Sequence, residues 1–318
     1  MKIITGNSVV VLKKINGMEQ WFKKYIKHRE LVFLFLPGLI FYLVFHYAPI
    51  YGVLIAFKDY KLRVGIMGSP WVGLENFQRL FGSASFLQVF MNTVIISTLK
   101  LAFCFPAPII LALLLNEVKN MRFKKTIQTV SYLPHFISWI VLTGLFMQLL
   151  SPSTGLVNQI IKAFGLKPIF FIADPGWFRT VLVITAMWKE IGWNSIIYLA
   201  ALSGINLEMY ESAAIDGAGR FKQALHITLP SLASVITIMF ILAVGRFIND
   251  DFDQIFNMYN AAVYKVGDVI STYTYRVGLI DMNYSFATAV ELFKNAIALV
   301  LIVTTNAISK KVNEYGIY

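Results

Sequence analysis

Long apolar stretches separated by shorter polar stretches dominate the pattern of this chain. A helix that crosses the hydrocarbon core of a bilayer needs about 20 mostly apolar residues. Six windows meet this requirement: 31–57, 86–115, 132–150, 179–203, 230–249 and 287–309. The pattern therefore predicts an all-α, polytopic membrane protein with six transmembrane helices.

Prolines interrupt the first two windows and stand near the start of the third. Pro37 and Pro49 lie in the first window, Pro106 and Pro108 in the second, and Pro134 in the third. Inside a membrane, backbone groups freed by proline are satisfied by neighbouring helices or along a water-filled cavity. We interpret the prolines as kinks in a packed bundle, with a direct role in a substrate path as the alternative.

Composition agrees with a membrane protein and excludes several other classes. The 318 residues are 57% hydrophobic and 14% charged, whereas a soluble domain has about 25% charged residues. The net charge of +11 comes from basic residues beside the apolar windows, which indicates membrane topology and no nucleic-acid partner. The single cysteine, Cys104, and four scattered histidines predict neither a disulfide nor a metal site.

Orientation follows from Lys and Arg, which are enriched in cytoplasmic loops. With the N-terminus inside, fifteen of the 28 basic residues flank the cytoplasmic face and nine flank the other. We therefore expect both termini in the cytoplasm, with 1–30 as a basic segment, 31–309 as the transmembrane domain and 310–318 as a tail. The first apolar window is too long for a signal peptide and is interpreted as an uncleaved anchor.

The same orientation puts the polar loop 204–229 in the cytoplasm. Asn206 is suited to cap a helix, and Gly217 permits a sharp change of direction before a second short helix. Pro230 is tolerated in the first turn of the next span. We expect two short helices at an angle that project from the membrane. From composition alone, the alternative is an amphipathic loop that lies on lipid.

Within this loop, small and acidic residues stand at fixed offsets: Glu211, Ala213, Asp216-Gly217-Ala218 and Ile227-Thr228-Leu229-Pro230. The spacing resembles the coupling loop of the membrane subunits of sugar-type ABC importers, with Ser212 in place of the usual first alanine. The resemblance implies that the loop docks on an ATPase. The residues expected to do so are Tyr210, Glu211, Ala213, Ala214, Asp216, Gly217, Ala218, Arg220 and Phe221.

Other parts of the chain resemble the same family. They are Leu36-Pro37-Gly38, residues 71–77, Asn92-Thr93 and residues 188–194, while residues 51–60 resemble the branch that handles oligosaccharides and polysaccharide fragments. The resemblance implies a type I ABC importer permease fold in the bacterial cytoplasmic membrane, surrounded by membrane lipid. It also implies four kinds of partner: a second homologous permease, two ABC ATPase subunits, an extracytoplasmic solute-binding protein and a sugar substrate.

Motifs for catalysis are missing from the sequence. It contains no Gly-x-x-x-x-Gly-Lys-[Ser/Thr] loop and no Ser/His/Asp or Cys/His set at a recognisable spacing. The chain is therefore expected to have no catalytic residues and no cofactor of its own, with ATP and Mg bound by the partner ATPase.

Ionisable groups inside membrane spans are expensive and commonly mark function or buried pairs. Glu291 and Lys294 are three residues apart on one helix and are expected to pair. An excess of cations over anions within the windows would suit an acidic glycan. The ionisable residues are Lys100, Lys189, Glu190, Arg246, Glu291 and Lys294.

A cluster in the fourth window is the candidate substrate path, because sugars bind through hydrogen bonds and stacking on aromatic rings. The alternative is that the cluster serves helix packing. The acidic stretch 249–254 either faces a partner protein or is a solvated loop. The candidate path residues are Trp188, Lys189, Glu190, Trp193, Asn194 and Tyr198.

These observations together favour the permease subunit of an ATP-driven, binding-protein-dependent importer for sugars, with oligosaccharides as the expected class. An ion-coupled secondary transporter that needs no ATPase is the alternative. A membrane scaffold is a third class. Neither alternative accounts for the residue spacing over 211–230.

Overall fold

The computed structural model describes residues 29–249 and 251–313, which are predominantly helical. The described part contains no β-sheet, only an isolated antiparallel bridge between Lys58 and Trp71. The predicted all-α class is confirmed. The chain divides into two units, one formed by the described residues up to Ile55 with Lys61–Ser69, the other by Ala56–Tyr60 with the rest of the chain from Pro70.

The first apolar window forms a helical stretch over Arg29–Phe57 that is long and apolar enough to span a membrane. It begins as α2 (Arg29–Tyr42), widens to a π-helical turn η1 (Leu43–Tyr47) and ends as the 3₁₀ helix η2 (Ala48–Phe57). Pro37 lies within α2, so the chain continues as a helix through this proline. The short helix α3 (Gly65–Gly68) also belongs to this unit.

In the second unit, the second and sixth windows are also helices of membrane-spanning length. Helices α5 (Ala84–Cys104) and α6 (Pro106–Asn116) form one candidate span, broken only at Phe105. The break falls where Pro106 starts α6, because proline cannot donate the hydrogen bond that would continue α5. Helix α18 (Tyr284–Asn313) forms the other, and α4 (Glu75–Gly82) precedes α5.

The third and fifth windows each belong to a bent pair of helices. Helices α7 (Met121–Tyr132) and η3 (Leu133–Phe136) meet α8 (Trp139–Leu149) at 106°. The segment 220–231, made of α12 (Arg220–Gln223), η4 (Ala224–Thr228) and α13 (Leu229–Ser231), meets α14 (Ala233–Gly245) at 63°. The third window captured only the apolar part of its bent pair, because α7 is amphipathic and has low hydropathy. The fifth window began at Pro230, near the end of the first helical segment of its pair.

The fourth window forms the long helix α10 (Phe178–Leu202), within one residue of the predicted bounds. Among the described residues, three helices qualify as spans by length and composition, or five if each bent pair is one span. Helix α10 is not among them and contains Arg179, Lys189 and Glu190. The count of six therefore stays a prediction, while the polytopic helical architecture is clear.

Short helices fill the connections. Within the described part of the acidic stretch 249–254, Gln254 of α15 (Phe252–Met258) is fully buried, and α15 packs against α8, so this part is not simply a solvated loop. The remaining elements are α9 (Leu156–Ala163), α11 (Leu207–Ile215), α15 (Phe252–Met258), η5 (Ala261–Val263), α16 (Tyr264–Gly267), α17 (Ile270–Tyr275) and η6 (Arg276–Ile280).

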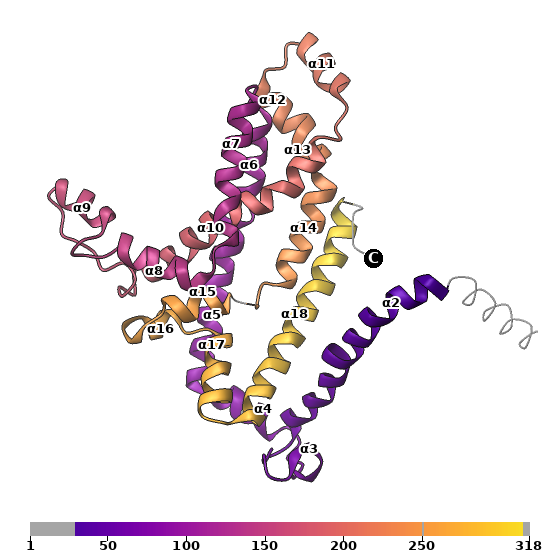
Figure 1. Cartoon of the computed structure of the whole chain (residues 1–318), viewed down its shortest axis with the longest axis vertical. Helices are drawn as coiled ribbons and strands as arrows, with labels where there is room; N and C mark the ends of the chain where they lie inside the picture. The colour runs from indigo at the N-terminus through magenta and orange to yellow at the C-terminus, as the bar shows by residue number, and fades with distance from the viewer. Residues whose placement is uncertain (1–28, 250, 314–318) are drawn as a thin grey trace, which may run out of the picture. The chain divides into compact units, whose positions relative to one another are not determined.

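Helix α10 is the centre of packing in the second unit. It packs against α5, α6 and α7, while α14 packs along α18 (Figure 1). One apolar cluster joins Phe178 and Leu182 of α10 to Ile96 of α5 and Ile255 of α15. Another joins Tyr198 to α6 and to the start of α14. Helix α10 thus presents one face to the core and leaves another for the site described below.

Gly192 allows α7 and α10 to approach each other closely. A Cβ atom at this position would collide with the backbone carbonyl of Ser131, whereas a Cβ at Gly144 would meet nothing within 4 Å. We expect Gly192→Ala to cost about 1–3 kcal/mol of stability through overpacking. Gly144→Ala, the matched control, should be neutral or stabilising, since alanine favours a helix over glycine. Thermal unfolding in detergent would compare the two; equal melting temperatures would contradict the close packing at Gly192.

Candidate translocation cavity and coupling loop

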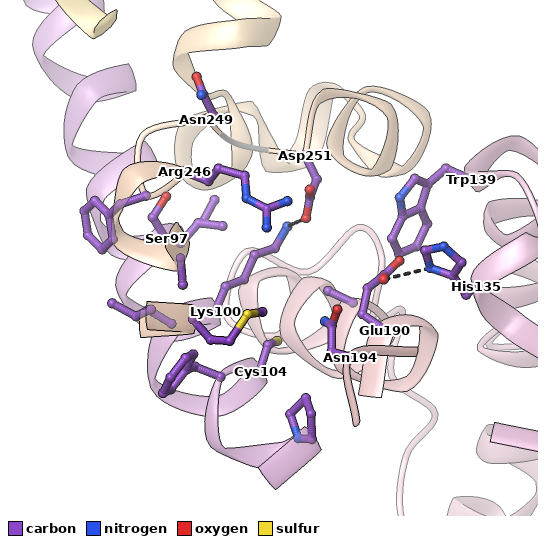
Figure 2. A pocket seen from close by; sticks show the side chains of 18 of the residues that line it. Ser97, Lys100, Cys104, His135, Trp139, Glu190, Asn194, Arg246, Asn249 and Asp251 are labelled. Carbon is purple, nitrogen blue, oxygen red and sulfur yellow. Dashed lines mark hydrogen bonds and ion pairs between the residues drawn. The ribbon is translucent and has the colours of Figure 1, made fainter. Parts of the chain in front are cut away.

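A cavity of about 470 Å³ lies among α5, α6, α10, α14 and the bend that precedes α8. Its apolar lining comes from residues such as Ile96, Met239 and Phe247. The polar and aromatic side chains that reach it are shown in Figure 2 and include Ser97, Lys100, His135, Trp139, Glu190, Asn194, Arg246, Asn249 and Asp251. The mixture of rings, amides and charges is the kind of lining that binds a polyhydroxylated ligand.

Three of the six candidate path residues line this cavity: Glu190, Asn194 and Tyr198. They are four residues apart along α10, so they share one helix face. Trp188, Lys189 and Trp193 lie outside the cavity lining. The spacing within the fourth window alone could not separate the two groups, because it does not say which face of α10 is open.

Lys189 is buried, and its ammonium group donates hydrogen bonds to backbone carbonyls at the sharp bend before α8. Its Nζ donates hydrogen bonds to the carbonyl oxygens of Pro134 at 3.2 Å, His135 at 2.6 Å and Ile137 at 2.8 Å. The same atom lies 5.6 Å from the centre of the Trp139 ring. Carbonyls left over where a helix breaks must find donors inside a membrane. Lys189 supplies them, so its role here is structural.

Like Lys189, the tryptophans Trp188 and Trp193 lie outside the cavity lining and contact neighbouring residues. Trp193 stacks on the His135 ring with centroids 4.4 Å apart and planes 2° apart, and His135 Nδ1 lies 2.9 Å from Glu190 Oε2. Trp188 packs edge-to-face on Phe146. Trp193 therefore does not line the cavity itself but holds in place the ring of His135, which does.

Lys100 links α5 to the segment that carries α15. Its Nζ lies 2.7 Å from Asp251 Oδ2 and 2.6 Å from Gln254 Oε1. Gln254 in turn donates to the carbonyl of Leu182 at 2.7 Å and to Thr185 at 2.8 Å. The contact closes a network across α5, α15 and α10. Elsewhere, the expected pairing of Glu291 with Lys294 is confirmed at 2.7 Å.

Several cavity residues were not singled out as path residues by the sequence. His135 and Trp139 appeared only as parts of an irregular apolar window, and they reach the cavity because the chain bends there by 106°. Lys100 and Arg246 were flagged only as charges within windows. Since the lining comes from five separate segments, residue spacing within one segment could not have predicted which residues line the cavity.

The loop 204–229 forms two short helices, as expected. Asn206 caps α11 by accepting the Glu208 amide at 3.0 Å. The helix ends in a tight turn where the Ala218 amide donates to the Ala213 carbonyl at 2.8 Å and Gly217 has φ +80°. This is a Schellman-type stop that favours glycine. Helix α12 then starts at Arg220, so the chain reverses within a few residues (Figure 1).

The two helices are anchored at their base and exposed at their tip. Tyr210 Oη lies 2.9 Å from Thr228 Oγ1, and Arg220 pairs with Glu117 at 2.9 Å. Ile215 and Phe221 are 87% and 81% exposed. Among the proposed docking residues, Tyr210, Ala213 and Ala218 are half-buried and Glu211, Ala214, Asp216, Gly217, Arg220 and Phe221 are exposed. Most of the set is therefore accessible to another protein.

A second polar network lies between α14 and α18, outside the spanning segments. Arg276 donates to both carboxylate oxygens of Asp268, at 3.3 and 2.5 Å, and this hydrogen bonding raises the pKa of Arg276. Burial, together with a hydrogen bond to Tyr264, raises the pKa of Tyr259 to about 12. At neutral pH the Tyr259 phenol is therefore neutral and the Arg276 guanidinium is charged. The hydrogen bonds between Arg276 and Asp268 fix this connection.

Comparison with known proteins gives a consistent picture. A model of the family described as "Binding-protein-dependent transport system inner membrane component" matches residues 105–252. The matched region contains the bend, α10 and the loop 204–229.

Two curated proteins of Bacillus subtilis (strain 168) are similar over nearly their full length. The polygalacturonan/rhamnogalacturonan transport system permease protein YteP is 43% identical, over 93% of this chain and 92% of YteP. Protein LplB is 41% identical, over 94% of each chain. Among solved structures, a bacterial ABC transporter involved in the import of the acidic polysaccharide alginate contains a chain that is 39% identical. That match has a TM-score of 0.86 and covers 92% of this chain and 99% of that chain.

Proposed function

This chain belongs to the family of binding-protein-dependent transport system inner membrane components, and from this premise we propose that it is the permease subunit of an ATP-driven importer for oligosaccharides. In this proposal it forms half of the translocation path. A second homologous permease forms the other half, and an extracytoplasmic solute-binding protein delivers the sugar. One relative is named for the transport of polygalacturonan and rhamnogalacturonan, and another for the import of the acidic polysaccharide alginate. These names support fragments of acidic polysaccharides as the substrate class.

The observation that carries the proposal is the exposed pair of helices α11 and α12, which joins directly onto the helical segment that lines the cavity. The tip offers Ile215 and Phe221 to a partner, and the sequence contains no nucleotide-binding loop of its own. We propose that two ABC ATPase subunits bind ATP and Mg, and that one of them docks on this tip. The tip, and both termini with residues 1–30 and 310–318, then lie in the cytoplasm.

The free energy that a docked helix transmits must be large enough to change which side of the membrane the cavity opens to. Changing a two-state ratio from 1:99 to 99:1 requires about 5.5 kcal/mol of differential binding. A well-anchored pair of helices is suited to carry this energy, because Tyr210 and Asn206 hold α11 in a fixed geometry at its base. The cavity residues Glu190, Asn194 and Tyr198 would meet the passing sugar.

Uptake into proteoliposomes that contain the complete importer tests this function. We expect accumulation of an oligosaccharide that depends on trapped ATP and on the solute-binding protein, and that persists when an ionophore collapses the proton gradient. Uptake that needs a proton or sodium gradient and no ATP would instead establish the ion-coupled alternative. Assembly without any uptake would favour a scaffold.

A further inference from the structure

Five Lys and Arg residues lie within the predicted windows, and the structure accounts for four of them. Arg179, at the start of the fourth window, donates to the Val266 carbonyl at 3.1 Å and to Asn92 Oδ1 at 2.8 Å. Lys189 is used by backbone carbonyls at the bend, and Lys100 is held by Asp251 and Gln254. Lys294 pairs with Glu291 on its own helix. The charge excess noted in the sequence therefore reduces to one residue, Arg246.

Arg246 follows the last turn of α14 and lines the cavity. Its guanidinium group points into the cavity, and in the view of Figure 2 it extends toward Lys100 and Asp251. Within residues 29–249 and 251–313 it has no ion-pair partner, and its side chain is exposed. A guanidinium group presents a planar fork of donors that matches a carboxylate in two hydrogen bonds.

Both carboxylates of the cavity lining already have partners within the lining. Glu190 is held by His135, and Asp251 by Lys100. Trp139 adds an aromatic surface at the cavity wall, and Asn194 adds an amide that pairs with hydroxyl groups. The cavity thus combines one unpaired cation with a ring for stacking and neutral hydrogen-bonding groups. A sugar that bears a carboxylate complements all three.

We propose that Arg246 is a specificity-determining residue that binds the carboxylate of an acidic sugar unit in the cavity. This inference rests on the proposed function and names the chemistry of its substrate at one residue. Neutral oligosaccharides lack the group that Arg246 pairs with, so the importer should prefer uronic acid oligomers over neutral sugars of the same size.

The test uses the complete importer in proteoliposomes with saturating solute-binding protein. Uptake of a galacturonic acid trisaccharide is compared with uptake of its carboxyl-reduced, neutral counterpart. The variants are Arg246→Gln, Arg246→Lys and, as the matched loss of one exposed positive charge outside the cavity, Lys167→Gln. We expect Arg246→Gln to lower uptake of the acidic sugar about tenfold or more, the size of a lost charge-assisted hydrogen bond. Neutral uptake should stay within about twofold, and Lys167→Gln should equal the wild type. Arg246→Lys should fall between Arg246→Gln and the wild type, because lysine keeps the charge and lacks the planar fork.

Other results would overturn the inference. Unchanged acidic uptake in Arg246→Gln, or an equal loss for both sugars, would assign Arg246 to helix termination alone. A wild type that carries only the neutral sugar would remove the acidic specificity while leaving the proposed function intact. If the wild type carries only the acidic sugar, the lysine variant decides, because a loss as large as that of Arg246→Gln would exclude charge recognition. Transport of neither sugar would contradict the proposed function itself.

Discussion

Replacing Lys189 by methionine is expected to destabilise the helix bundle by about 2–6 kcal/mol, although Lys189 touches no cavity. The methionine side chain preserves the apolar stem and removes the ammonium that serves three carbonyls at the bend. The Pro134 carbonyl keeps the Ile137 amide as a donor, whereas the carbonyls of His135 and Ile137 lose the donor that Lys189 supplied. An unsatisfied buried polar group costs about 1–3 kcal/mol, and membrane surroundings offer no water as a substitute.

Thermal unfolding of the purified chain in detergent would measure this effect. Lys162→Met is the matched control, because Lys162 is exposed on α9 and donates a long hydrogen bond, 3.4 Å, to the Ser153 carbonyl. The control should unfold at the wild-type temperature. If Lys189→Met also unfolds there, the bend is stabilised by other contacts and the structural role of Lys189 is wrong.

Replacing Gly217 by valine is expected to lower ATP-driven uptake by a factor of roughly 5–30 while leaving membrane insertion intact. Gly217 has φ +80°, a conformation that is especially unfavourable for a β-branched residue. The penalty of about 1–2 kcal/mol lowers the population of the tight turn by a factor of roughly 5–30. With the turn lost, α11 and α12 no longer present Ile215 and Phe221 together.

Gly219 provides the control for this experiment. It has φ −69° and no atom within 4 Å of an added Cβ, so Gly219→Ser should keep full activity and cap α12. Gly217→Asn should retain more activity than Gly217→Val, because asparagine tolerates the left-handed conformation. Co-purification of the ATPase with each variant reports docking directly. Wild-type yield of ATPase with Gly217→Val would show that the turn is not needed for docking.

Much of the architecture was accessible from the sequence because hydrophobic length is a strong signal. The predicted windows around α5–α6, α10 and α18 agree with the helices to within a few residues. The windows 132–150 and 230–249 missed most of the first helix of each bent pair, because window averages favour apolar residues and discount amphipathic helices such as Met121–Tyr132. Local backbone chemistry was also readable: the Asn206 cap and the Gly217 turn follow from residue type alone.

The cavity was harder to predict, since it depends on which helix faces meet. Adjacent residues Lys189 and Glu190 have the same sequence context and different roles. Lys189 points to carbonyls at the bend, whereas Glu190 reaches the cavity beside His135. A rotation of about 100° per residue around the helix separates them. Such a difference becomes visible only when the packing of α7 and α8 against α10 is known.

The helical segment that begins at Arg220 ends where Arg246 enters the cavity, with a π-helical turn over Ala224–Thr228 and a 63° bend between its ends. Under the proposed function, the end that faces the ATPase, at Arg220, and the end that faces the sugar, at Arg246, therefore belong to one continuous helical segment. Binding free energies at two linked sites are reciprocal. Sugar bound in the cavity should then change the affinity of the ATPase for the α11–α12 tip by the same factor by which the bound ATPase changes the affinity for sugar. The ATPase would in this way sense whether the cavity is loaded.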